Sequence, residues 1–129
     1  MGKDPDFLTL DEVLAIHAHQ IRCYGGSSGL RDRALLESAL AMPPAAFGGE
    51  RLHASVWEQA AAYLFHLTKN LAFVDGNKRV GLSCCLVFLR LNGRRVGATD
   101  DELVELVEGV AGGAVTKSDV AVFLQSHGR

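Results

Sequence analysis

Residues 69–91 read KNLAFVDGNKRVGLSCCLVFLRL, and this stretch decides the fold. Its second part, residues 77–91, is apolar nearly all round, which is typical of a helix surrounded by other helices. The Asn-Gly pair at 92–93 is a common helix stop. In the first part, the DGN triplet at 75–77 breaks the apolar pattern, and two cations follow it. The stretch therefore predicts a buried helix that is preceded by a short polar loop.

Helix signals continue on both sides of this stretch, and strand alternation is almost absent. Three capping-box patterns, each marking the first turn of a helix, occur at Thr9-x-x-Glu12, Thr99-x-x-Glu102 and Thr116-x-x-Asp119. Helices are predicted over residues 10–24, 30–42, 54–70 and 77–91, and after the second and third of these boxes. Residues 94–96 could form a strand, but a single strand would have no partner in this chain.

We therefore predict an all-α fold, a compact bundle of about six helices around the buried helix at 77–91. At 129 residues the chain is expected to form a single domain with one core, over about residues 7–126. Hydrophobic residues make up 48% of the chain and the net charge is -2, so neither disorder nor a general nucleic-acid-binding surface is indicated. Any anion-binding site must therefore be local.

The cysteines and the hydrophobic runs indicate where in the cell the protein is expected. Cys23, Cys84 and Cys85 form no C-x-x-C pair, and we interpret them as small buried residues of a protein in the reducing cytoplasm. The hydrophobic runs are interrupted too often to span a bilayer, so no membrane partner is expected. A cytoplasmic protein is predicted.

The polar loop has the features of an anion-binding site. The amides of residues 76–78 should lie at a helix N-terminus, where unpaired N–H groups and the helix dipole favour an anion. Lys78 and Arg79 add positive charge there, and Gly76 lets the backbone approach a phosphate. Asp75 could hold Mg²⁺, which needs few carboxylates when phosphate oxygens complete its coordination. In the alternative interpretation, a side chain of the loop merely caps the helix and the cations are solvated.

The loop resembles the signature of the Fic/Doc superfamily, and of its Doc (death-on-curing) toxin branch in particular. That signature reads H-x-F-x-(D or N)-(A or G)-N-K-R. The matching residues here are Phe73, Asp75, Gly76, Asn77, Lys78 and Arg79. The stretches YGGSSGLRDRALLESAL at 24–40 and LVFLRLNG at 86–93 are also similar to Doc proteins, so the resemblance covers nearly the whole chain.

The resemblance implies a small helical toxin of a type II toxin-antitoxin system. Such a toxin transfers a phosphoryl group from ATP to a threonine of elongation factor Tu, and its partner is a Phd-type antitoxin. Fic proteins proper transfer AMP instead, with a motif ending G-N-G-R-x-x-R. Lys78 stands where that motif has its last Gly and Leu82 where it has its second Arg, and both departures point to the Doc branch.

The resemblance also implies roles for single residues. Asp75 would help to hold Mg²⁺, Gly76 and Asn77 would line the anion loop, and Lys78 and Arg79 would neutralise the phosphates of ATP. Phe73 would anchor the loop in the core. These roles suit phosphoryl transfer, in which positioning and charge neutralisation supply most of the catalysis.

Position 71 departs from the signature, because Leu71 stands where the family has its histidine. Leucine has no lone pair to accept the proton of a target hydroxyl. Losing a positioned general base typically costs on the order of 10² to 10⁴ in rate, so the chain as given is expected to be nearly inactive. His66 should not substitute, because it lies about 140° round the preceding helix.

Leu71 has two explanations. A toxin that kills its host is often prepared with its essential residue replaced, and the other blocks of the signature would then stay intact. Alternatively, the chain is a natural pseudoenzyme that binds nucleotide or antitoxin without transfer. The persistence of residues 75–79 favours the first explanation.

Other polar residues carry weaker signals. His17 and His19 point about 200° apart on a helix, which disfavours a shared metal and suggests exposed or half-buried positions. Arg22, Tyr24 and Arg31 border the YGG turn, and they either flank the active site or belong to the ordinary surface. A nucleotide- or peptide-binding module without catalysis remains an alternative function. Direct nucleic-acid binding through Arg90, Arg94 and Arg95 is not expected, since the net charge is negative.

Overall fold

The computed structural model describes residues 4–129, and this part of the chain contains six helices and one two-stranded hairpin. The prediction of an all-α fold is confirmed. The elements are α1 (Leu10–Tyr24), α2 (Arg33–Ala41), β1 (Ala46–Phe47), β2 (Glu50–Arg51), α3 (Val56–Asn70), α4 (Asn77–Leu91), α5 (Asp100–Ala111) and α6 (Lys117–Ser126).

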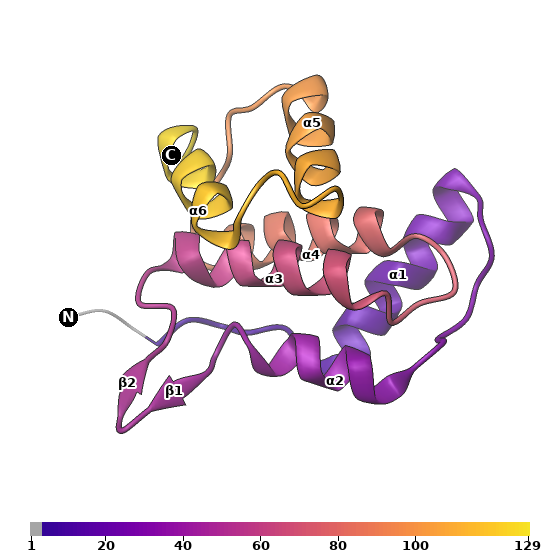
Figure 1. Cartoon of the computed structure of the whole chain (residues 1–129), viewed down its shortest axis with the longest axis horizontal. Helices are drawn as coiled ribbons and strands as arrows, with labels where there is room; N and C mark the ends of the chain where they lie inside the picture. The colour runs from indigo at the N-terminus through magenta and orange to yellow at the C-terminus, as the bar shows by residue number, and fades with distance from the viewer. Residues whose placement is uncertain (1–3) are drawn as a thin grey trace.

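Helices α3 and α4 lie side by side at the centre of the bundle (Figure 1). Helix α3 also packs against α2, α5 and α6, whereas α1 packs against α4. One face of α4 is buried in the core, at Val80, Gly81, Cys84, Cys85, Phe88 and Leu89. Val87 and Leu91 on its other face are 37% and 50% exposed, so α3 and α4 together form the centre.

Local side-chain chemistry explains where the helices begin. Capping boxes start α1, α5 and α6 at the three predicted positions, and a fourth, not predicted, starts α3 with Ser55 and Glu58. Helix α2 begins three residues later than predicted, at Arg33, because Asp32 accepts a hydrogen bond from the Leu35 amide. Leu30 is not helical, since it forms a β-bridge with Phe73.

Two further strand-like pairings were not foreseen. The idea that residues 94–96 would lack a partner is wrong, because Val96 forms an antiparallel bridge with Gly128. The amides of Arg95 and Arg129 each donate to the other's carbonyl. The hairpin of β1 and β2 projects from the bundle and exposes 89% of Phe47 at its tip (Figure 1).

The cysteine interpretation is partly wrong. Cys84 and Cys85 are buried in α4, and burial raises the pKa of the Cys84 thiol to about 12. Cys23, however, is exposed near the end of α1, with its sulfur 3.5 Å from Nε2 of His19. None of the helices in residues 4–129 combines the length and the apolar character needed to cross a membrane.

Candidate active site

The loop between α3 and α4 is held by a segment of chain about 40 residues earlier. The amides of Arg31 and Asp32 both donate to the Ala72 carbonyl, at 2.8 and 2.9 Å. In return, the Val74 amide donates to the Gly29 carbonyl at 3.1 Å. Residues 29–32 therefore form a strap that pairs with the loop, and we use this name for them below.

Two side chains of the signature hold the loop from within. Phe73 is 2% exposed and lies in the core. Asn77 spans the loop, because its Oδ1 accepts from the Phe73 amide and its Nδ2 donates to the Phe73 carbonyl, each at 3.0 Å. The side chain of Asn77 is thus occupied by the loop itself.

The first turn of α4 is not capped by a side chain. Its N-cap residue is Gly76, in the left-handed conformation at φ 77°, and within residues 4–129 no side chain bonds to the first-turn amides. The alternative in which Asp75 or Asn77 caps the helix is therefore not what the structure shows. Uncapped N–H groups at a helix N-terminus favour an anion.

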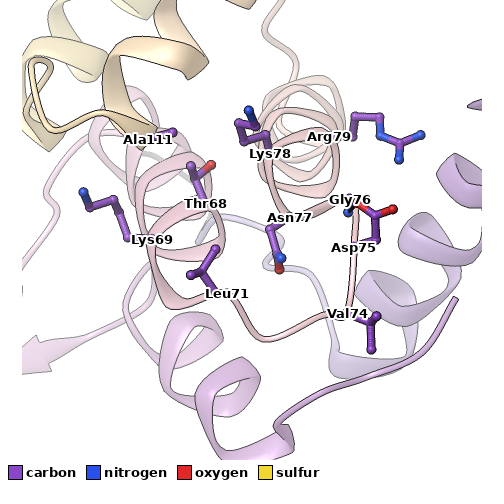
Figure 2. Close-up of a pocket in the computed structure, with 10 residues that line it drawn as sticks. All are labelled: Thr68, Lys69, Leu71, Val74, Asp75, Gly76, Asn77, Lys78, Arg79 and Ala111. Carbon is purple, nitrogen blue, oxygen red and sulfur yellow. Dashed lines mark hydrogen bonds between the residues drawn. The ribbon is translucent and has the colours of Figure 1, made fainter. Parts of the chain in front are cut away.

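A cavity of about 410 Å³ opens at this helix start. Six of the residues singled out from the sequence line it: Leu71, Asp75, Gly76, Asn77, Lys78 and Arg79. Thr68, Lys69, Val74 and Ala111 complete the lining. Figure 2 shows Thr68, Lys69 and Leu71 on the α3 side, across from the loop and the start of α4. Phe73 lies beneath the loop and not in the cavity wall.

The charged groups of the cavity have different partners. Asp75 accepts from the amides of Ser27 (3.2 Å) and Gly76 (2.8 Å), and these bonds lower the pKa of its carboxyl below the ordinary value. Nζ of Lys78 lies 2.9 Å from Oε1 of Glu108 in an exposed ion pair with α5. Asp75 therefore presents an ionised, exposed carboxylate at neutral pH.

Gly26 lies close to the side chains of Asp75 and Arg79. A Cβ atom at position 26 would lie 2.7 Å from Oδ2 of Asp75 and 2.9 Å from Nη2 of Arg79. The backbone φ of +111° also favours glycine. The YGG turn thus forms part of the site, which the sequence indicated only through its resemblance to Doc proteins.

Leu71 ends α3 in the left-handed conformation, at φ 53° and ψ 44°, and is 53% exposed. It is the one residue other than glycine with positive φ in the described part of the chain. Its carbonyl accepts from both Nε (2.8 Å) and Nη2 (2.5 Å) of Arg31. Arg31 therefore holds the backbone at the position of the family histidine.

The remaining residues near the YGG turn and on α3 lie elsewhere. Arg22 and Tyr24 are exposed and do not line the cavity, and Tyr24 is 71% exposed. His66 does not line the cavity either. Its Nε2 lies 3.1 Å from Nζ of Lys117, and burial lowers the pKa of the imidazole to about 4.

His17 was expected at an exposed or half-buried position, and this expectation is wrong. It is 4% exposed, its Nε2 lies 2.7 Å from the Asp75 carbonyl, and its ring stacks on Phe73. The spacing from Val13 to His17 to Ile21 follows the buried face of α1 and could have indicated this position.

The cavity fits a nucleotide with its magnesium ion. Its volume lies in the range of small-molecule sites, roughly 300–1,000 Å³. Within residues 4–129 no cluster of three or more histidine, cysteine or acidic side chains could hold a metal by itself. A single carboxylate such as Asp75 nevertheless suits Mg²⁺ when phosphate oxygens supply further ligands.

The fold and the site together define an all-α protein with an uncapped helix start beside an exposed carboxylate. A family model described as "Fic/DOC family" matches residues 7–89, and the chain belongs to this family. The resemblance drawn from the signature is thereby confirmed.

Two curated relatives are Doc proteins. The chain is 40% identical to "Toxin Doc" of Mycolicibacterium smegmatis over 78 residues, which is 60% of each chain. It is 34% identical to "Protein kinase doc" of Escherichia phage P1 over 111 residues, or 86% of each chain. The first match thus spans less than two thirds of the relative's own length.

Proposed function

We propose that this chain is a Doc-like toxin of a type II toxin-antitoxin system. It transfers a phosphoryl group from ATP to a hydroxyl of elongation factor Tu in the cytoplasm, and Leu71 leaves it nearly inactive. Membership of the Fic/DOC family and similarity to a toxin and to a protein kinase support this proposal. A Phd-type antitoxin is its proposed partner.

The uncapped start of α4 is the observation that carries the proposal. In this cavity a carboxylate, two cations and unpaired amides lie within one helical turn. Such an arrangement binds a polyphosphate with Mg²⁺, which supplies charge neutralisation for phosphoryl transfer. A smaller cavity of about 180 Å³ also reaches Lys78 and Arg79, but Asp75, Gly76 and Asn77 do not line it.

Each residue of the site has a proposed role. Asp75, oriented by the amides of Ser27 and Gly76, holds Mg²⁺. Lys78 and Arg79 neutralise the phosphates, and the backbone of Gly76 and Asn77 lines the anion loop. Lys78 exchanges its Glu108 partner for a phosphate oxygen when nucleotide binds.

Position 71 lacks the group that takes the proton of the target hydroxyl. Its backbone conformation supports histidine as the residue suited to this position, because histidine adopts the left-handed region more readily than leucine. For leucine this conformation costs roughly 1–2 kcal/mol. The missing base and the strain both lie at the same residue.

The test compares Leu71→His with Leu71→Asn. Both replacements tolerate the left-handed backbone, but only histidine offers a general base at the required place. Phosphate incorporation into elongation factor Tu from ATP and Mg²⁺ is measured by mass spectrometry. We expect Leu71→His to raise the rate on the order of 10² to 10⁴ over the parent and Leu71→Asn to leave it unchanged.

Other outcomes would replace this proposal. An AMP adduct on the target would indicate a Fic-type transfer. Tight nucleotide binding by Leu71→His without any transfer would indicate a binding module. Equal gains with histidine and asparagine would show that relief of strain, and not a base, limits the rate.

A further inference from the structure

His17 is a buried polar side chain in contact with the active-site loop. Its Nε2 lies 2.7 Å from the carbonyl oxygen of Asp75, and its ring stacks on Phe73 with centroids 3.8 Å apart and planes 12° apart. A carbonyl oxygen only accepts hydrogen bonds, so Nε2 must carry the proton. The imidazole therefore donates to the backbone of the residue proposed to hold the metal.

This hydrogen bond fixes one peptide group. The Asp75 carbonyl belongs to the peptide that leads into Gly76, the N-cap residue of α4. Rotation of that peptide would redirect both the Asp75 carboxylate and the first amides of the helix. A Cβ at Gly76 would lie 3.5 Å from Nε2 of His17, so the peptide rests closely on the imidazole.

Packing alone does not explain a histidine here. Its neighbours on the buried face of α1 are apolar, at Val13 and Ile21, and an apolar side chain would fill the same space. A buried imidazole N–H costs free energy unless it is hydrogen-bonded. The donor at this position therefore requires its acceptor, which is the Asp75 carbonyl.

We propose that His17 is a positioning residue, which orients the Asp75 carboxylate for Mg²⁺ through the Asp75–Gly76 peptide. This inference rests on the proposed function, since it takes Asp75 as the metal-binding residue. Groups that orient metal ligands typically change metal affinity by about 10- to 100-fold when removed. His17 acts through the loop and does not touch the nucleotide.

Two variants separate the donor from the ring. His17→Phe keeps an aromatic ring to stack on Phe73 but removes the donor, and His17→Gln keeps an N–H donor at similar reach. Calorimetry measures the binding of a non-hydrolysable ATP analogue to each full-length chain, with Leu71 retained, in the presence and absence of Mg²⁺.

The pattern of affinities decides the inference. We expect His17→Phe to lose about tenfold in the presence of Mg²⁺ and less than about threefold without it, with His17→Gln close to the parent. An equal loss with and without Mg²⁺ would indicate a structural role only. Parent-like Mg²⁺ dependence in His17→Phe would also overturn the inference.

A second test uses NMR spectroscopy of the protein without nucleotide. In ¹⁵N-labelled protein we expect His17 to carry a proton on Nε2, and the amide signals of Gly76 and Asn77 to move in His17→Phe but not in His17→Gln. A neutral imidazole protonated on Nδ1 would overturn the inference. If the parent bound no nucleotide, the proposed function would fail, and these spectra would still decide how His17 acts on the loop.

Discussion

The first turn of α4 differs from the first turns of the other helices. In residues 4–129, capping boxes start α1, α3, α5 and α6, and Asp32 caps α2, whereas no side chain caps α4. The four helices that begin with capping boxes carry acidic residues in their first turns, but the first turn of α4 carries Lys78 and Arg79. Asp75 accepts from the Gly76 amide, just before the first turn, so the fold leaves only the first-turn amides of α4 without a side-chain acceptor, and it does so at the cavity.

The largest effect expected from this comparison concerns the space beside Asp75. Gly26→Ala places a Cβ 2.7 Å from the Asp75 carboxylate and 2.9 Å from Arg79, and we expect nucleotide affinity to fall tenfold or more, about 1.4 kcal/mol. Gly25→Ala is the matched control, because φ is also positive there but a Cβ would contact nothing within 4 Å. Calorimetry measures the nucleotide affinity of both variants. Equal losses of affinity would show that backbone strain alone causes the effect.

A second prediction compares the two lysines at helix starts. Lys117 in the first turn of α6 donates to neutral His66, whereas Lys78 in the first turn of α4 pairs with Glu108. Because the folded-state pKa of His66 is lowered to about 4, the unfolded chain binds more protons between about pH 6.5 and 4. Stability should therefore fall as the pH decreases through that range, by about 1–2 kcal/mol at pH 5 after allowance for partial exposure.

Urea unfolding at pH 5 and pH 7.5 measures this loss. In His66→Leu the difference between the two pH values should shrink by most of that amount, because the imidazole no longer titrates. An unchanged difference in His66→Leu would place the loss at other groups, such as His53, whose pKa is also lowered by burial.

A third prediction removes an ordinary cap. Thr99 caps α5, and Thr99→Ala should lower the free energy of unfolding by about 1 kcal/mol, because the Glu102 amide loses its acceptor. Nucleotide affinity should stay the same, since α5 reaches the cavity only near its other end, through Ala111 and through Glu108, the partner of Lys78. A loss of nucleotide affinity in Thr99→Ala would contradict the expectation that the cap of α5 does not affect the site.

The smallest expected effect concerns the ion pair that holds Lys78. Glu108→Gln should raise nucleotide affinity about two- to threefold at low salt, because exposed ion pairs contribute about 0.2–1 kcal/mol. Glu105→Gln, an exposed residue on the same helix, removes equal charge without touching Lys78 and serves as the control. Equal gains in both variants would indicate a long-range charge effect.

Local patterns predicted most of the fold. The capping boxes at Thr9, Thr99 and Thr116 placed three helix starts, and the apolar run at 77–91 placed α4, because these signals depend only on neighbouring residues. Seven of the ten residues that line the cavity likewise fall within the signature at 71–79. Their chemical roles, by contrast, remain predictions.

The features that the sequence did not reveal depend on contacts between residues far apart in the chain. Arg31 meets the Leu71 carbonyl across 40 residues, and His17 meets the Asp75 carbonyl across 58. The bridge between Val96 and Gly128 joins two short segments that show no strand alternation. Such partners can be identified only once the helices are placed in space.

The strap has a consequence for the order in which the molecule assembles. Because the loop is held by the strap and by α1, closing it must overcome the entropy of bringing these separate stretches together. A peptide containing the signature alone would lack every one of these supports. The proposed capacity to bind nucleotide should thus appear only when the helices have docked.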